Sequence, residues 1–159
     1  VETIAERRCV IKVLQNETVR TDFSNANLKG VIIGAGEYPN NFFNFVDFSG
    51  ADLTGIEFSG LKFGACKFNG ANLKNSNMSN VVFHHCEFDN AKFNDSKFFT
   101  TAYQDVSFRN AKIIDSYFES SLFIDTNFSN ADLKGTTFSG ELLTFGHNVL
   151  SCKNNQICD

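Results

Sequence analysis

A large apolar residue recurs at every fifth position along most of this 159-residue chain, and this period restricts the possible folds more than any other feature. The nineteen residues met in steps of five from Phe48 to Phe138 are all large and apolar, and thirteen of them are Phe. The residue two positions before each of them is small or aliphatic, and none carries a charge. Because only 42% of the chain is apolar, chance does not explain this double pattern.

The five-residue period fits neither a straight strand nor a helix. Two inward residues separated by one outward residue have the spacing of a strand. The next inward pair begins three residues later, so the inward side changes in every pentapeptide. A helix of 3.6 residues per turn cannot hold a five-residue register. The chain must therefore turn a corner once in every five residues.

The residues at the expected corners support this interpretation. Of the twenty-four corner positions from Asn25 to Gly140, seven are Gly, seven are Asn and four are Asp. These residue types tolerate the positive φ angle that many tight turns require. The number of corners per coil follows from a second regularity, a column of aliphatic residues that lie twenty or forty positions apart: Leu53, Leu73, Ile113 and Leu133. A coil of twenty residues with four faces explains this column.

Four segments resemble the A(D/N)LXX signature of the pentapeptide repeat proteins, three of them over five residues and one over three. They are Ala26-Asn27-Leu28-Lys29-Gly30, Ala51-Asp52-Leu53-Thr54-Gly55, Ala71-Asn72-Leu73 and Ala131-Asp132-Leu133-Lys134-Gly135. The resemblance covers residues 46–140 and extends to 21–45. It implies an all-β fold, a right-handed quadrilateral β-helix of about six coils. Function varies widely within this family, so the resemblance predicts the fold and leaves the biochemical role open.

We predict one domain over residues 1–159, with the repeats at 21–140. Residues 1–20 and 141–159 are expected to form caps, because the open ends of a solenoid expose unpaired backbone groups. Residues 34–45 are predicted to be a loop or a distorted coil, since Gly36 and Asn41 occupy inward positions and Pro39 cannot donate to a strand ladder. Such a loop would shift the face assignment of residues 21–33.

The five cysteines fall into three groups. Cys152 and Cys158 lie outside the repeats and lack the second Cys or His pair of a structural zinc site. We expect them to form a disulfide, and two free thiols are the alternative. Cys66 and Cys86 occupy inward positions twenty residues apart, where we expect them to act as small buried residues; a disulfide between them is the alternative. The sequence does not place Cys9.

No constellation of residues predicts catalysis, a cofactor or a metal site. The run His84-His85-Cys86 has metal-binding residue types, but Cys86 must point inward while the histidines take outward and corner positions. We therefore interpret His84 and His85 as an exposed surface pair. A coil filled with Phe from four faces leaves no concave site for acyl-transfer or carboxylate chemistry. The chain is predicted not to be an enzyme.

Charge and composition narrow the remaining function classes. The net charge of −4 predicts no nucleic-acid-binding patch, and no apolar run approaches the ~18 residues of a membrane span. Our first hypothesis is a noncatalytic structural or protein-binding solenoid with an unidentified protein partner or a second copy as a homodimer. The start at Val1 fits a processed precursor or a shortened chain, and a disulfide would require an oxidising compartment. The resemblance to exported family members implies the thylakoid lumen or the periplasm.

The alternative hypothesis is a DNA mimic that inhibits a type II topoisomerase, a role that the resemblance to the quinolone-resistance members implies. Duplex DNA carries one negative charge per ~1.7 Å, so six coils spanning about 29 Å would need about seventeen mimicking charges. This chain interleaves its 18 acidic residues with 14 basic ones, which argues against mimicry. A third hypothesis places the solenoid in a larger regulatory assembly, docked through residues 34–45.

One outward column is more apolar than its neighbour. We expect it to be centred on Phe63, Phe83, Tyr103, Phe123 and Leu143, with Leu142 and Thr144 outward at its end. Stacking then aligns an apolar stripe made of Val82, Ala102, Leu122 and Ile124. Contiguous exposed apolar surface usually marks a contact site, so we interpret the stripe as a protein-binding face. The alternative is that Phe145, Val149 and Leu150 fold back and cover it.

Overall fold

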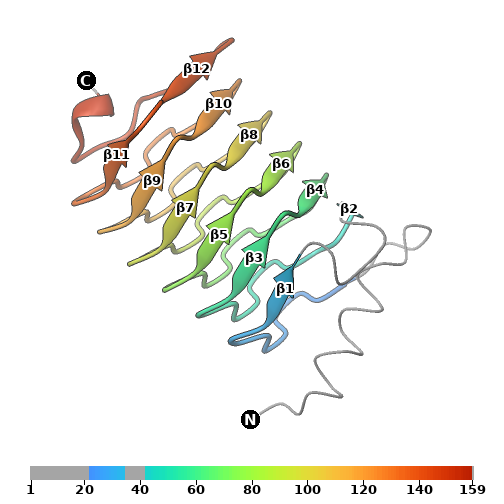
Figure 1. The fold of residues 1–159 in the computed structure, drawn as a ribbon. Coiled ribbons are helices and arrows are strands. Elements are labelled where there is room, and N and C mark those ends of the chain that lie inside the picture. Colours follow the sequence, from blue (N-terminus) through green and yellow to red (C-terminus); the bar gives the residue numbers. More distant parts are fainter. Residues whose placement is uncertain (1–21, 35–41, 159) are drawn as a thin grey trace.

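The computed structural model describes residues 22–34 and 42–158, which form a four-sided solenoid of short parallel strands (Figure 1). The predicted cap at residues 1–20, Cys9 and the middle of the predicted 34–45 loop lie outside the described residues. The repeats make about five regular turns between residues 46 and 145, with part of a further coil before them. The all-β pentapeptide coil expected from the sequence is confirmed.

Two parallel six-stranded sheets form two of the four faces. The first sheet contains β1 (Ile32–Gly34), β3 (Glu57–Ser59), β5 (Asn77–Ser79), β7 (Lys97–Phe99), β9 (Tyr117–Glu119) and β11 (Thr137–Ser139). The second contains β2 (Phe42–Asn44), β4 (Lys62–Gly64), β6 (Val82–His84), β8 (Ala102–Gln104), β10 (Leu122–Ile124) and β12 (Leu143–Phe145). Single bridges such as Asp47 with Lys67 and Asp52 with Asn72 hold the other two faces together. A 3-10 turn, η1 (Gln156–Cys158), ends the described chain, and no helix within the described ranges is long and apolar enough to cross a membrane.

Residues twenty positions apart pair with one another throughout the regular coils, as Phe58 does with Met78. The first coil departs from this rule, because Asn27 pairs with Asp52 and Ile32 with Glu57, twenty-five positions later. The chain between β1 and β2 therefore contains one additional pentapeptide, and the faces of residues 22–33 are shifted by five residues.

The corner residues adopt positive φ angles at every fifth position from Phe45 to Gly140. Gly and Asn take this conformation readily, but Ala65 (φ 50°) and Thr100 (φ 53°) do so against their intrinsic preference. Each is held by a backbone hydrogen bond to the next coil, from the Ala65 amide to the His84 carbonyl (2.9 Å) and from the Thr100 amide to the Glu119 carbonyl (2.8 Å). The hydrogen bonds between stacked coils thus stabilise a positive φ angle that Ala and Thr rarely adopt.

The core consists of the two inward positions of each pentapeptide. Eighteen of the nineteen predicted central residues are at most 3% exposed, and Phe138 is half-buried at the end of the solenoid. Rings of successive coils lie nearly parallel, as Phe68 and Phe88 do with centroids 4.6 Å apart and planes at 8°. The predicted inward orientation of the Phe series is confirmed.

Candidate protein-binding surface

The register of the chain changes at the C-terminal end of the second sheet. Leu122 pairs with Leu143 and Phe123 with Thr144, twenty-one positions apart instead of twenty. The cause is Glu141, which stands where the regular period requires a small buried residue, and a carboxylate cannot be buried there without a partner. The prediction that Leu143 is the central residue of this coil is therefore wrong, because Thr144 takes that place.

This one-residue shift opens an apolar cavity at the end of the core. Thr144 lies where each earlier coil has a ring or another large side chain, so it fills less space above Phe123. A cavity of about 190 Å³ results, and all but two of its lining residues are apolar: Phe123, Phe128, Phe138, Leu142, Thr144, Asn148, Leu150 and Ile157. The core of the solenoid is thus incompletely sealed at its C-terminal end.

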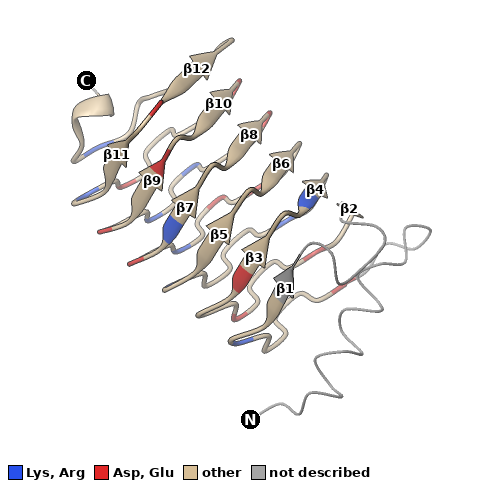
Figure 2. Ribbon diagram, viewed as in Figure 1, with Lys and Arg blue, Asp and Glu red and all other residues tan. Residues whose placement is uncertain are grey.

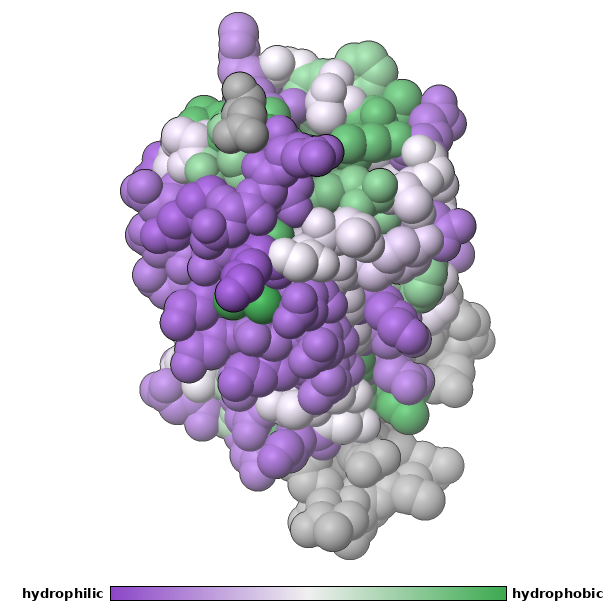
Figure 3. All heavy atoms as spheres, turned by 90° about the vertical axis from the view of Figure 1, so that its left-hand side faces the viewer, coloured by the Kyte–Doolittle hydropathy of each residue, from purple (hydrophilic) through white to green (hydrophobic). Residues whose placement is uncertain are grey.

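The same shift exposes large apolar side chains around the cavity. Five of them are 37–56% exposed and form what we call the C-terminal apolar patch: Leu142, Leu143, Phe145, Val149 and Leu150. Figure 3 shows a surface that is hydrophilic over most of its height, with hydrophobic residues gathered toward the C-terminal end at the top. Five of the eight exposed large apolar side chains of the described residues therefore lie at the C-terminal end, and the other three, Ile32, Phe42 and Phe45, lie at the N-terminal end.

The structure places the four residues of the predicted stripe in two neighbouring columns. Val82, Ala102 and Leu122 are direct cross-strand neighbours in β6, β8 and β10, whereas Ile124 follows the column of His84 and Gln104. All four stripe residues are half-buried. Leu143 and Phe145 continue the two columns beyond Leu122 and Ile124, so the stripe runs into the C-terminal apolar patch.

The last residues are tied across the end of the solenoid. Cys152 and Cys158 form a candidate disulfide with Cα atoms 5.0 Å apart. The Asn155 side-chain amide donates to the carbonyl oxygens of Leu133 (3.0 Å) and Thr136 (2.7 Å), which belong to the last regular coil. These contacts connect the segment that carries Ile157, a residue of the cavity wall, to the last regular coil.

The remaining cysteines of the described residues are unpaired and buried. The thiol of Cys66 donates to the Phe43 carbonyl and that of Cys86 to the Phe63 carbonyl, each over 3.4 Å. Burial raises the pKa of the Cys86 thiol. Both side chains therefore act as small core residues that are hydrogen-bonded to the backbone.

Charged residues of both signs are distributed over the faces (Figure 2). On the face formed by single bridges, Lys92 and Lys112 are neighbours in one column, with Asn72 before them and Asp132 after them. No described face carries an unbroken column of carboxylates, because each of the columns that contains Asp or Glu also contains Lys, Arg or uncharged residues. The electrostatic surface is therefore mixed.

Fold and surface together define a parallel β-solenoid that has a five-residue repeat, a filled aromatic core and an apolar end. The chain carries pentapeptide repeats: the model of the Pentapeptide repeats family matches residues 56–95 and 104–140, in eight copies. Among curated proteins, none matches the sequence significantly.

Three solved structures illustrate the likeness to known proteins. A trypsin-treated variant of QnrB1, a plasmid-mediated fluoroquinolone resistance protein, is 19% identical over 88% of this chain and 72% of that chain, with a TM-score of 0.43. A pentapeptide repeat protein from the Arabidopsis thaliana thylakoid lumen is 18% identical over 79% and 71% of the two chains, with a TM-score of 0.38. Rfr23 from the cyanobacterium Cyanothece 51142 is 15% identical over 77% and 90%, with a TM-score of 0.39.

Proposed function

We propose that this chain is a noncatalytic protein-binding solenoid that docks a protein through its C-terminal apolar patch. The observation that carries the proposal is the exposure of Phe145, 56% exposed, in the C-terminal apolar patch, of which Leu142 and Leu150 also line the apolar cavity. Exposed aromatic side chains in contiguous apolar surface are typical of protein interfaces.

The size of the cavity favours a protein over a small-molecule ligand. At about 190 Å³ it is smaller than the ~300–1,000 Å³ of typical ligand pockets, but it can receive one apolar side chain. The exposed side chains around it offer the additional apolar area that a protein interface needs.

A second copy of the chain is the partner that we propose first. The same end of the molecule carries a protruding ring, Phe145, and an apolar cavity. Two copies related by a two-fold axis would each present both features, which is the condition for a self-complementary interface. A homodimer joined at the C-terminal ends is the arrangement that this geometry supports.

The DNA-mimic alternative receives less support. A mimic needs a continuous acidic surface, and the adjacent Lys92 and Lys112 interrupt the column in which they lie. A topoisomerase supercoiling assay distinguishes the two functions, because potent inhibition by the wild-type chain would contradict our ranking.

We also propose that the chain works in an oxidising compartment such as the thylakoid lumen or the periplasm. The support is the candidate disulfide between Cys152 and Cys158, since disulfides persist in such compartments and are rare in the cytosol.

Sedimentation equilibrium tests the proposed dimer. We expect the wild-type chain to dimerise and Phe145→Asp to be monomeric, because an ionised carboxylate in the interface would lose its hydration. The matched control is Ile32→Asp, which changes a residue of similar exposure (54%) at the other end of the solenoid and should leave the dimer intact. A wild-type chain that stays monomeric, or a Phe145→Asp variant that still dimerises, would contradict the proposal.

The predicted stripe is tested by a double variant, Leu122→Asp with Ile124→Asp. If the stripe belongs to the same binding face, this variant abolishes self-association and leaves the thermal melt nearly unchanged. A large loss of stability would show instead that these half-buried side chains are internal packing, and the stripe would be removed from the interface.

A further inference from the structure

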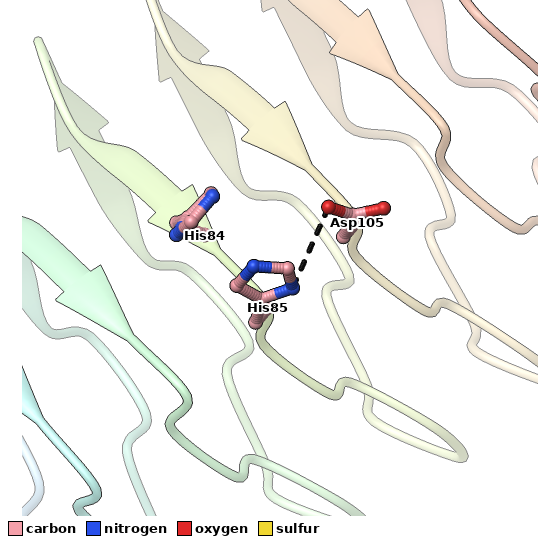
Figure 4. Close-up of side chains that lie close together, drawn as sticks. All are labelled: His84, His85 and Asp105. Carbon is pink, nitrogen blue, oxygen red and sulfur yellow. Dashed lines mark ion pairs between the residues drawn. The ribbon is translucent and has the colours of Figure 1, made fainter.

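We propose that His84, His85 and Asp105 form a binding site for a divalent transition-metal ion of the Zn²⁺ type. Their potential ligand atoms, imidazole nitrogens and a carboxylate oxygen, all lie within 4.8 Å of one another (Figure 4). The site lies at the corner that follows β6 and β8, on the surface of the central coils and apart from the C-terminal apolar patch.

The corner conformation brings the two adjacent histidines to the same side of the chain. Consecutive residues of a strand point to opposite faces, and His84 is the last residue of β6. His85 has a φ angle of 54°, so the alternation ends there. The two ring centroids lie 3.9 Å apart with their planes at 58°, which places both imidazoles next to the same volume of solvent.

The third group comes from the next coil. Asp105 is the corner residue twenty positions after His85 and has the same conformation, with φ 50°. Stacking of the coils brings the Asp105 Oδ2 to 3.4 Å from the His85 Nδ1 (dashed line in Figure 4). The site therefore depends on the twenty-residue coil and is not visible in any short segment of the sequence.

The backbone that carries these side chains is held by hydrogen bonds between coils. The His85 amide donates to the Gln104 carbonyl and the Asp105 amide to the Ile124 carbonyl, each over 3.0 Å. A tetrahedral zinc ion with bonds of about 2.1 Å needs ligand atoms about 3.4 Å apart. The ligand atoms therefore have to approach one another from distances of up to 4.8 Å. Rotation about the side-chain bonds of the exposed residues His85 and Asp105 allows this approach without movement of the backbone.

The donor set selects the class of ion. Imidazole nitrogens suit Zn²⁺, Cu²⁺ and Ni²⁺, whereas Mg²⁺ and Ca²⁺ prefer oxygen ligands alone. Three protein ligands leave at least one coordination position for water or for a group from another molecule. The single carboxylate offsets part of the charge of the ion.

Neighbouring residues with metal-binding groups are already engaged elsewhere. The Cys86 thiol points into the core, where it donates to the Phe63 carbonyl. Asp125, the corner residue after Asp105, accepts a hydrogen bond from the His147 amide (2.6 Å). Asp105 is therefore the carboxylate that completes the histidine pair, in place of the cysteine that follows the pair in the sequence.

Isothermal titration of the full chain with Zn²⁺ tests the site. We expect saturable binding of one ion per chain, with Mg²⁺ giving no binding at the same concentration. The variants His84→Ala, His85→Asn and Asp105→Asn should each weaken Zn²⁺ binding about tenfold or more, since even the loss of groups that only orient ligands costs about 10–100-fold. Asn tolerates a positive φ angle, so the two corner variants preserve the fold, and circular dichroism checks this.

Two control variants assign the binding to this cluster. His147→Ala removes the remaining histidine, and Cys9→Ser removes a thiol outside the described residues; both should bind Zn²⁺ as the wild type does. Zn²⁺ should also shift the imidazole proton resonances of His84 and His85 in the nuclear magnetic resonance spectrum and leave those of His147 in place. Absence of Zn²⁺ binding to the wild type, or equal binding by folded Asp105→Asn and His85→Asn variants, would overturn the proposal.

Discussion

The buried backbone amide of Ser96 donates a hydrogen bond to the hydroxyl oxygen of Ser116, one coil further along, over 3.2 Å. Ser76 makes the same contact to Ser96, and Ser116 makes it to Thr136. At Ile56 in the same column, the amide donates instead to the carbonyl three residues before it. A column of buried hydroxyl groups thus supplies the acceptors that the turn does not provide at these three positions.

Removing one hydroxyl from this column should be costly. We expect Ser116→Ala to lower the free energy of unfolding by about 1–2 kcal/mol, because the buried Ser96 amide loses its acceptor. Urea denaturation measures this loss. Ser59→Ala, at an exposed position of β3, should change stability by less than about 0.5 kcal/mol, and equal effects of the two substitutions would mean that the column does not contribute.

The aromatic core predicts a larger loss. The Phe88 ring lies between those of Phe68 and Phe108, with centroid distances of 4.6 and 5.1 Å, and its side chain is fully buried. Phe88→Ala should cost roughly 3–5 kcal/mol through the cavity it leaves. The half-buried, outward-facing Phe99 provides a control, since Phe99→Ala should cost much less. A loss below about 1 kcal/mol for Phe88→Ala would show that this ring is not a core residue.

Tyr103 is a position at which substitution should stabilise the fold. Its ring is stacked between those of Phe83 and Phe123, but its buried hydroxyl has no hydrogen-bond partner among the described residues. Tyr103→Phe removes this unsatisfied group and should raise the free energy of unfolding by about 1 kcal/mol. A lower melting temperature for the variant would show that the hydroxyl is satisfied in solution.

The same hydroxyl gives the stability a dependence on pH. Burial raises the pKa of Tyr103, so the folded state keeps its proton where the unfolded chain, with a tyrosine pKa of about 10, loses it. The stabilising contribution is therefore present below about pH 10 and is lost as the pH rises above that value. Urea unfolding at about pH 8 and about pH 10.5 should show a steeper loss for the wild type than for Tyr103→Phe. Identical slopes would contradict the assignment.

The candidate disulfide predicts a difference between oxidised and reduced protein. A crosslink between residues six positions apart should contribute about 2 kcal/mol through the restricted unfolded chain. Intact-mass analysis after alkylation under denaturing, non-reducing conditions should show three labelled thiols, those of Cys9, Cys66 and Cys86. Five labelled thiols in protein freshly purified from its native compartment would rule out the crosslink between Cys152 and Cys158.

The sequence by itself determined the coil and its core. The five-residue period, the inward side chains and the corner positions are local properties that are repeated many times, so each repeat supports the same interpretation. Phe88 and Ser96 could be assigned to the core without coordinates, because every charged residue from 46 to 140 falls outside the two inward positions of its pentapeptide.

The tertiary structure decided the features that depend on register between coils. After Glu141 the pairing in the second sheet shifts by one residue, which places Thr144 over Phe123 and exposes Phe145. Asp105 meets His85 only because stacked corners bring residues twenty positions apart into contact. A shift in strand pairing is carried to the residues that follow it, so a single residue too polar to bury alters the contacts between the last two coils. The five-residue period therefore predicts which residues point inward. Which residues meet across neighbouring coils depends on the register of strand pairing, which changes where a pentapeptide is added or a residue cannot be buried.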